Sequence, residues 1–321
     1  MSADVFAQIR EACARVARQA RSVRIDPRRV EALGAELSQP APRAERKDPA
    51  RRTFRDAQTT LAYVLTLDAI NFGSGWFPAL RKRPGMSGYF TIATSLEEHF
   101  AVQGAWNAEQ LSALDAGECA RIFGQDLSSP DAAALMSLFA RALNDLGHFL
   151  GEDYAGRFEG PVEAAGGRAA RLVELLASMP LYRDVARYGG FDVPFYKRAQ
   201  ITAADLGAGL GECGLGRFED IDELTLFADN LVPHVLRCEG VLRYTAELER
   251  RIDAGELIAA GSPEEVEIRA SAVHAVEGCA AAAGRAGRPV SVRHLDWLLW
   301  NRGQCAEIKA RPRHRTRTPY Y

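Results

Sequence analysis

A proline that follows an isolated carboxylate divides two apolar segments of the chain and fixes where helices can begin. Residues 223–237 read ELTLFADNLVPHVLR. Pro233 fits best in the first turn of a helix, where its missing N–H is not needed, and it pushes Val232 toward extended geometry. We therefore expect Asp229 at a junction between two helices. Asp229 is either an N-cap of the second helix or a carboxylate aimed at a ligand, and from this stretch alone the cap is favoured.

Similar start signals recur along the chain. Asn107, with a glutamine three residues later, has the pattern of a capping box, and Ser129 and Ser262 each stand directly before a proline. Apolar residues recur at helical spacing, as they do over residues 3–20. Only residues 189–195 suggest short extended pieces. The sequence therefore predicts an all-α, mainly helical fold with few or no short strands.

One glycine pattern has a possible dinucleotide-binding interpretation. Gly209, Gly211 and Gly214 match GxGxxG, a fingerprint that requires a strand before it and a helix directly after it. Here the preceding residues 195–205 have helical spacing, and the residues that follow are polar. We therefore reject dinucleotide binding and expect a surface loop over residues 207–216.

Charge and apolar content exclude several classes of function. The formal net charge of the 321 residues is −2, so no global basic field is available to hold a nucleic-acid polymer. No apolar run is long enough to span a membrane, and residues 1–21 lack the apolar core of a signal peptide. The six cysteines and six histidines show no CxxC or HExxH spacing. We expect a cytoplasmic monomer with no cofactor, no metal, no membrane partner and no nucleic-acid partner.

Acidic and aromatic side chains fall at positions where they can meet a ligand. Asp296 and Trp300 are four residues apart and share a helix face. A buried aspartate beside a tryptophan is costly unless it is paired, and either Arg269 or a cationic ligand would satisfy it. Phe72 and Trp76 lie in a glycine-rich turn, where they can stack on a flat ring or close the end of a helical bundle.

The C-terminal segment, residues 309–321, is strongly basic and ends in two tyrosines. Most basic tails are solvated, and a tyrosine pair is unusual for such an end. The alternative is that the segment folds back and places arginine or tyrosine side chains near a phosphate.

Together these segments resemble the queuosine salvage family, the queuosine 5′-phosphate N-glycosylases. The matching pieces are LDAINF at 67–72, YRDV at 182–185, FYKRAQI at 195–201 with Asp205, FAD at 227–229 with Pro233, EVEIR at 265–269, Asp296 with LLW at 298–300, and the closing HRTR and YY. They run in the family's order from about residue 60 to the C-terminus. The Trp76–Phe77 loop and the glycine-rich loop depart from the pattern, as does Asn301, which stands where an acidic residue is common.

The resemblance implies hydrolysis of the N-glycosidic bond of queuosine 5′-monophosphate, with release of queuine for salvage into tRNA. It implies a helical fold similar to that of helix-hairpin-helix DNA glycosylases. Residues 1–55 would be N-terminal helices and a basic linker packed on the core. Residues 56–321 would be the catalytic domain, in which two helical lobes could hold the active site between them. Asp229 would be the catalytic carboxylate.

The chemistry of that substrate suits these residue types. Positive charge develops on the ribose in an oxocarbenium-like transition state, and a fixed carboxylate stabilises it or attacks C1′. Queuine is a 7-deazaguanine, so N7 protonation of the leaving group is unavailable and more of the barrier falls on the sugar side. Asp296 would pair with the secondary ammonium of the base or bind its diol, and Phe227 and Trp300 would enclose the flat ring.

The remaining site candidates fall into three groups. Those for the phosphate and ribose are Lys197, Arg198, His234, Arg269 and Tyr321, with the tail arginines. Those for the base also include Phe72, Trp76 and Asn301, and the supporting acids are Asp68, Asp205 and Glu267. Lys197 and Asp205 fit an ion network on one helix face equally well.

Two other functions remain open. A helix-hairpin-helix DNA glycosylase would need a basic surface and a base-flipping wedge, which the near-neutral charge argues against. A protein that binds a modified nucleoside without turnover would use the same aromatic and acidic residues, and only a product assay separates it from an enzyme.

Overall fold

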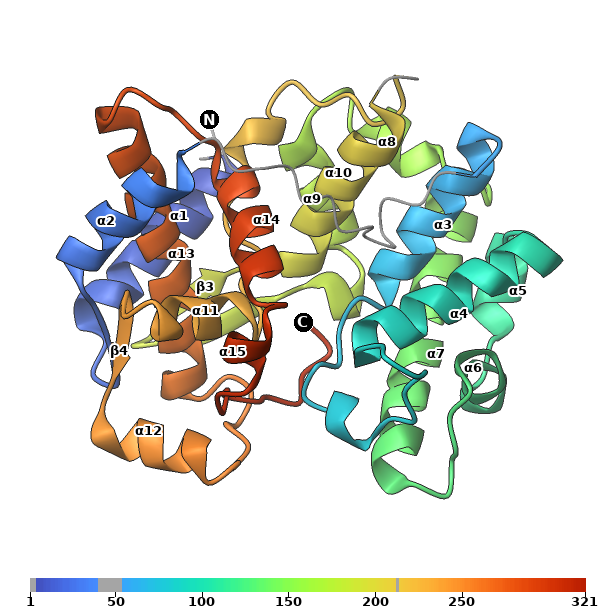
Figure 1. Ribbon diagram of the computed structural model, residues 1–321. Coiled ribbons are helices and arrows are strands. Elements are labelled where there is room, and N and C mark those ends of the chain that lie inside the picture. Colours follow the sequence, from blue (N-terminus) through green and yellow to red (C-terminus); the bar gives the residue numbers. More distant parts are fainter. Residues whose placement is uncertain (1–3, 40–53, 212–213) are drawn as a thin grey trace. The chain divides into compact units, whose positions relative to one another are not determined.

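The computed structural model describes residues 4–39, 54–211 and 214–321, and within these ranges the chain is mainly helical. The described residues form fifteen α-helices and four short strands (Figure 1). The prediction of a mainly helical fold is confirmed, whereas the likeness to helix-hairpin-helix glycosylases stays a prediction. Most of the predicted basic linker, residues 40–53, lies outside the described residues.

The described residues group into two compact units, each built from separate stretches of the chain. The first unit contains residues 4–39, 184–197 and 222–317, and the second contains residues 54–183, 198–221 and 318–321 without residues 212–213. The N-terminal helices are thus part of the first unit. The prediction of an active site between two lobes stays a prediction.

The core of the first unit is built around α13, Pro263–Arg285. Ser262 caps this helix as predicted, and its side chain accepts the N–H of Glu265. Helices α1 (Val5–Gln19) and α2 (Pro27–Leu37) pack against α13 (Figure 1). A side chain at Gly34 of α2 would meet the Cys279 carbonyl oxygen at 2.4 Å, so only glycine allows this close approach. Fully buried aliphatic side chains such as those of α13 contribute about 1.5–3 kcal/mol each.

Two antiparallel strand pairs accompany these helices. Strand β3 (Phe191–Pro194) lies within residues 189–195, where the sequence suggested extended pieces, and it pairs with β2 (Val185–Tyr188), which precedes that stretch. The pair β1 (Val23–Ile25) and β4 (Leu242–Tyr244) joins distant parts of the chain.

The spacing of apolar residues over Val235 to Ile252 predicts one helix, and this prediction is wrong. Helix α11 ends at Cys238, and the chain turns at Gly240, whose φ is 74°. Strand β4 follows, and a separate helix, α12, then runs from Ala246 to Asp253. The remaining helices of this unit are α11 (Val232–Cys238), α14 (Val292–Arg302) and α15 (Ala306–Lys309).

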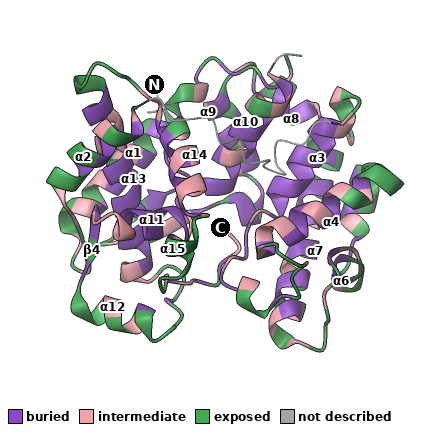
Figure 2. Cartoon of the chain, in the orientation of Figure 1, coloured by how far each residue is buried: buried purple, intermediate pink, exposed green. Residues whose placement is uncertain are grey.

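The second unit packs around α7, Pro130–Tyr154. Helices α3, α5, α6 and α8 contact α7, and α3 is buried at nearly every position, as Figure 2 shows. The capping box at Asn107 is confirmed. The bounds of the other helices are α3 Ala57–Ala69, α4 Gly88–Gln103, α5 Ala108–Ala113, α6 Ala116–Phe123, α8 Gly160–Ala164, α9 Ala169–Leu176 and α10 Lys197–Leu210. Because α10 reaches Leu210, the first residues of the expected glycine loop are helical.

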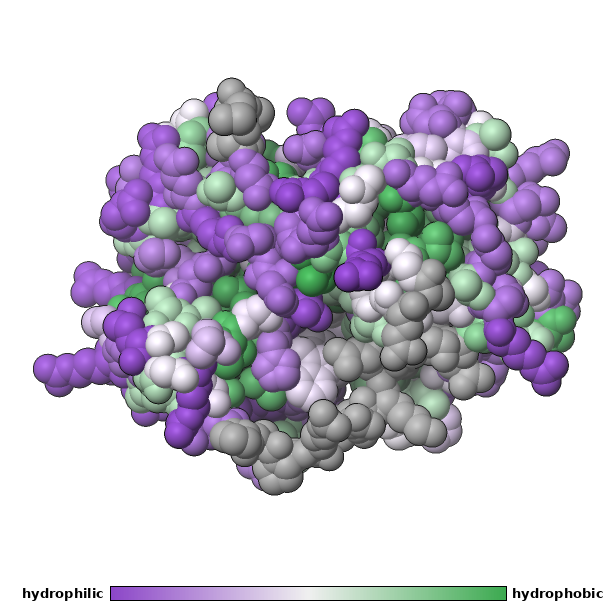
Figure 3. Space-filling model, turned by 90° about the horizontal axis from the view of Figure 1, so that it is seen from above, coloured by the Kyte–Doolittle hydropathy of each residue, from purple (hydrophilic) through white to green (hydrophobic). Residues whose placement is uncertain are grey.

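Hydrophilic side chains cover most of the described surface visible in Figure 3. Among the described residues, the exposed large hydrophobic side chains are Met86, Val102, Leu127 and Leu257, which lie far apart in the sequence. In the part of the chain that the structure describes, no helix combines the length and apolar character needed to cross a membrane.

Candidate active site

Asp229 lies in the loop that precedes α11, at the helix junction that the sequence predicted. Its Oδ1 accepts the N–H of Leu231 at 2.7 Å and the N–H of Val232 at 2.9 Å, so the carboxylate binds two backbone donors at the start of α11, although the N-cap residue itself is Leu231. Pro233 is in the first turn, as expected, whereas Val232, for which we expected extended geometry, is the first residue of α11. Both bonds use one oxygen, and Asp229 is only partly buried while the loop residues beside it are buried. The cap and the ligand interpretations are therefore compatible, because two backbone donors fix the carboxylate and the second oxygen stays available.

Asp296 of α14 lies beside this loop. Its Oδ1 accepts the N–H of Phe227 at 3.1 Å, and the residue is 7% exposed. Burial raises the pKa of Asp296 to about 8, and the negative charge of Asp229 adds to this shift. The Phe227 N–H and the Lys197 ammonium oppose it. The structure thus brings together two carboxyl groups in different environments, a pattern typical of sites that use one ionised and one protonated acid.

Two cationic side chains, from different segments of the chain, interact electrostatically with the two carboxyl groups. Lys197, the first residue of α10, is 5% exposed and attracts Asp296. Arg313, in the C-terminal segment, is attracted to Asp229, while burial lowers the pKa of its guanidinium. The sequence pointed to the tail arginines only as a group, and the structure singles out Arg313.

Arg269 does not pair with Asp296, as one interpretation of the sequence had it. Its guanidinium forms a two-bond ion pair with Asp184, with N–O distances of 2.9 and 2.6 Å, and lies 3.6 Å from Glu265. Its Nε donates to the carbonyl oxygen of Ala228 at 3.1 Å. Arg269 therefore holds the backbone next to Asp229.

Two buried histidines lie near the C-terminal segment, and the pKa of each imidazole is lowered by burial. Nε2 of His234 lies 3.0 Å from the Ile308 carbonyl oxygen, and burial lowers the pKa of the imidazole. Burial also lowers the pKa of His314 to about 3. A neutral imidazole attracts phosphate weakly, so His234 is less suited to the phosphate role expected for it.

Glu267 supports the fold of the first unit. Its Oε2 accepts the N–H groups of Arg21, Ser22 and Val23 at 2.6–3.2 Å, and its Oε1 accepts the Tyr188 hydroxyl at 2.8 Å. The carboxylate thus fastens both strand pairs to α13. This is a structural form of the supporting role expected for Glu267.

The sequence of this chain is similar to those of known proteins. The family model described as "Queuosine salvage protein" matches residues 51–321. The chain belongs to the queuosine salvage protein family. Proteins named queuosine 5′-phosphate N-glycosylase/hydrolase are similar to it over most of both chains. The one from Sphaerobacter thermophilus is 40% identical over 275 residues, 84% of each chain, and the one from Mus musculus is 32% identical over 336 residues, 97% of this chain and 98% of the relative.

A relative from Dictyostelium discoideum carries the same name and is 33% identical over 266 residues, which are 82% of this chain and 79% of the relative. In the first unit of this chain, Phe227, Asp229 and Asp296 lie close together. Trp300 and Asn301 follow on α14 and are partly buried, and the side-chain amide of Asn301 donates to the Trp297 carbonyl oxygen at 2.8 Å.

The other predicted site residues lie in the second unit. Arg198 is 1% exposed; it donates to the carbonyl oxygens of Ala69 and Leu181, and its guanidinium lies 4.8 Å from the ring centre of Phe72. These contacts are those of a structural arginine. Tyr321 is 2% exposed, and its carbonyl oxygen accepts the N–H of Gly73 at 3.0 Å. The basic C-terminal segment is thus folded against the protein at its end. The remaining predicted residues of this unit, all buried, are Trp76, Asp68 and Asp205.

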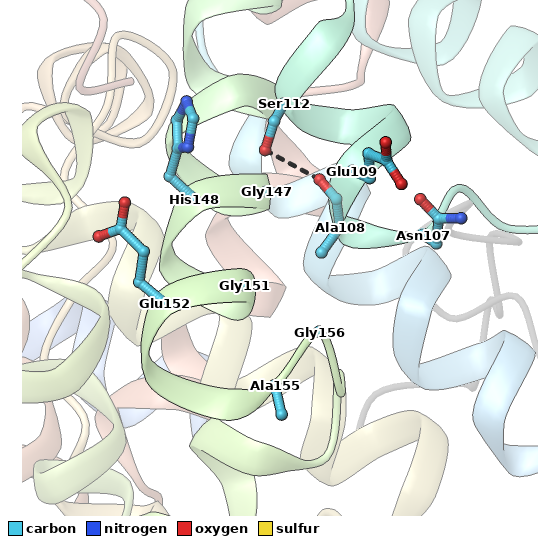
Figure 4. A pocket seen from close by; sticks show the side chains of 10 residues that line it. All are labelled: Asn107, Ala108, Glu109, Ser112, Gly147, His148, Gly151, Glu152, Ala155 and Gly156. Carbon is cyan, nitrogen blue, oxygen red and sulfur yellow. Dashed lines mark hydrogen bonds between the residues drawn. The ribbon is translucent and has the colours of Figure 1, made fainter.

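The second unit also has an open depression of about 470 Å³ between α5 and α7 (Figure 4). Gly147 and Gly151 form part of its wall, and Ser112 Oγ donates to the Ala108 carbonyl oxygen at 2.9 Å. A side chain at Gly147 would collide with Ser112, so this glycine serves the close packing of the two helices. None of the predicted site residues lines the depression.

Sequence reasoning assigned no role to Asp184, although it lies in the YRDV segment that resembles the family. Asp184 is 2% exposed and is the main partner of Arg269. Asp184 does not belong to a helix with a repeating apolar pattern, so periodicity could not reveal it. Only its place in the YRDV segment could have pointed to it.

Proposed function

We propose that this chain hydrolyses the N-glycosidic bond of queuosine 5′-monophosphate and releases queuine. The observation that carries the proposal is the pair of carboxyl groups, Asp229 and Asp296, which differ in burial and are joined through the Phe227 loop. The printed names of the relatives supply the substrate, and the site supplies groups suited to the reaction.

In this proposal Asp229 acts on the sugar. As the bond between C1′ and the base nitrogen breaks, its electron pair leaves with the base and positive charge grows on the ribose. The Asp229 carboxylate, fixed by the two N–H groups at the start of α11, stabilises that charge or attacks C1′ directly. Water then adds its oxygen to C1′, and the base gains a proton. Preorganised charge of this kind is commonly the largest contribution to catalysis.

Asp296 acts on the base. With its pKa raised to about 8, its carboxyl group is protonated at neutral pH and can donate a hydrogen bond. The secondary ammonium of queuine would lower that pKa, because a nearby positive charge favours the carboxylate. Binding of the base is then coupled to release of a proton from Asp296, and the acid ends in an ion pair with the ligand.

Lys197 and Arg313 supply the positive charge for the phosphate. Both act on the carboxyl groups of the site, and both belong to the same unit as Asp229. Arg269 forms an ion pair with Asp184, and Arg198 donates to the Ala69 carbonyl oxygen. We assign the phosphate contacts to Lys197 and Arg313 because these two cations act electrostatically on the carboxyl groups of the site.

The test is incubation of the purified protein with queuosine 5′-monophosphate, with free queuine followed by chromatography. The proposal expects stoichiometric excess of queuine over protein. Tight binding of the nucleotide by calorimetry with no queuine released would instead indicate a non-catalytic binding protein.

A further inference from the structure

A buried ion pair that takes no part in the proposed chemistry lies directly behind the candidate site. The side chains of Arg269 and Asp184 are 2% and 3% exposed, and two N–O contacts of 2.9 and 2.6 Å join them. Two such bonds fix the plane of the guanidinium. The ring of Phe195, 3.9 Å from the guanidinium carbon, covers that plane. Arg269 therefore has one well-defined orientation.

In that orientation the Nε–H of Arg269 points at the loop that carries Asp229. Its Nε donates to the Ala228 carbonyl oxygen at 3.1 Å, and Ala228 precedes Asp229. On the other side of Ala228, the N–H of Phe227 donates to Asp296. Arg269 thus holds the backbone at Ala228, between Asp229 and the residue whose N–H binds Asp296.

Asp184 acts in the same way on the segment that carries Lys197. Its Oδ2 accepts the backbone N–H of Lys197 at 3.2 Å, and its carbonyl oxygen accepts the N–H groups of Phe195 and Tyr196. Tyr196 has a φ of 47°, a left-handed conformation that side chains other than glycine rarely adopt. Such a conformation persists where the surrounding contacts impose it, and here it determines the direction in which Lys197 enters α10.

We infer that Asp184 and Arg269 are positioning residues that hold Asp229 and Lys197 in register for the reaction. The inference rests on the proposed function for what the register is used for. Arg269 fixes the backbone of the loop that carries Asp229, through the Ala228 carbonyl oxygen. Asp184 fixes the backbone of Lys197 through its N–H group. A shift of either partner moves both charged groups relative to the substrate.

A purely structural ion pair makes a different prediction, and a double variant separates the two. Replacing a buried ion pair by apolar side chains of similar size often preserves stability. Arg269→Met with Asp184→Leu should therefore remain folded but lose both backbone contacts. Arg269→Lys keeps the charge but cannot hold two carboxylate oxygens and Ala228 in one plane. Arg251→Met is the matched control. Arg251 donates hydrogen bonds to Glu256 and Glu264, and these bonds do not involve the loop that carries Asp229.

The first experiment measures the rate of queuine release and the affinity for the nucleotide separately. We expect the single-turnover rate constant for queuine release to fall by roughly 100-fold in the double variant and in Arg269→Lys, since misplacement by about 1 Å has effects of this size. The affinity for queuosine 5′-monophosphate should fall less than the rate, because the variants displace the Lys197 contact to the phosphate but leave Arg313 unchanged. The melting temperature should change little, and the control should match the wild type. Wild-type rates in a folded double variant would overturn the inference while leaving the proposed function intact.

The second readout does not depend on activity. Amide hydrogen exchange of peptides covering residues 224–232 and 195–199 should be faster in the double variant than in the wild type, because Asp184 and Arg269 no longer hold these segments. The control should leave both peptides unchanged. If the wild type released no queuine, the proposed function would fail, and this exchange would still decide the positioning role: unchanged protection in the double variant would refute it.

Discussion

At the scale of single residues, Asp229 and Asp296 lie in different environments, which suits the different roles proposed for them. Asp229 is partly exposed and takes two backbone N–H bonds on one oxygen. Asp296 is buried, takes one, and faces the negative charge of its neighbour. Burial disfavours the charged form of Asp296 and raises its pKa to about 8.

The raised pKa of Asp296 predicts how stability depends on pH. The folded protein keeps a proton that the unfolded chain loses, between the ordinary pKa of 3.8 and about 8. The free energy of unfolding should therefore fall with rising pH in this window, by up to about 1.4 kcal/mol per pH unit, and level off above it. Asp296→Asn removes this contribution. Its melting temperature relative to the wild type should rise between pH 5 and pH 8, and parallel curves for the two proteins would contradict the shifted pKa.

At the scale of helices and strands, local signals in the sequence were reliable and long-range pairings were not. The caps at Asn107 and Ser262 and the helix start at Pro233 were predictable, because each depends on a few adjacent residues. The break at Gly240 was missed because β4 pairs with β1, more than 200 residues away. Gly240 is a local stop signal within residues 235–252, but the strand that follows it depends on the pairing with β1.

The candidate site shows the same division. The acids and Phe227 could be named from the sequence, and the structure brings them together. For cations, the sequence gives charge but not partners, so Arg198 and Arg269 appeared as phosphate ligands. The structure buries both among carbonyl and carboxylate oxygens. Distinguishing a ligand-binding arginine from a structural one requires the tertiary contacts.

Glu267 illustrates how one side chain joins elements, and it yields a stability prediction. Glu267→Ala leaves three backbone N–H groups at the start of β1 without their acceptor, which should reduce the free energy of unfolding by about 3 kcal/mol. Glu264→Ala on the same helix, which loses only a partly exposed contact with Arg251, should cost less than about 1 kcal/mol. Urea denaturation compares the two. Equal losses would show that the Glu267 bonds carry no special weight.

At the scale of the whole molecule, the charge balance favours a small substrate over a nucleic-acid polymer. The 321 residues have 40 basic and 42 acidic side chains, and the basic C-terminal segment is bonded to the protein at Arg315 and at its last residue. Sites that follow a phosphate backbone need several cations on one surface. A single phosphate needs only the few cations proposed here.

This view predicts weak interaction with polyanions. The protein should not be retained on heparin at about 0.15 M salt, a concentration at which exposed charges beyond about 8 Å are screened. Strong retention that fell steeply with added salt would point instead to multiple phosphate contacts, and so to a DNA glycosylase. The comparison of retention at two salt concentrations decides between them.

The central claim is that Asp229 provides the charge for cleavage, and the most direct test compares the wild type with Asp229→Asn. Asparagine keeps the size and an oxygen that can accept the N–H groups of Leu231 and Val232, so the fold and nucleotide binding should persist. The single-turnover rate of queuine release from queuosine 5′-monophosphate should fall by at least about 100-fold, the typical cost of losing one preorganised electrostatic group. A folded Asp229→Asn protein that released queuine at the wild-type rate would contradict the account.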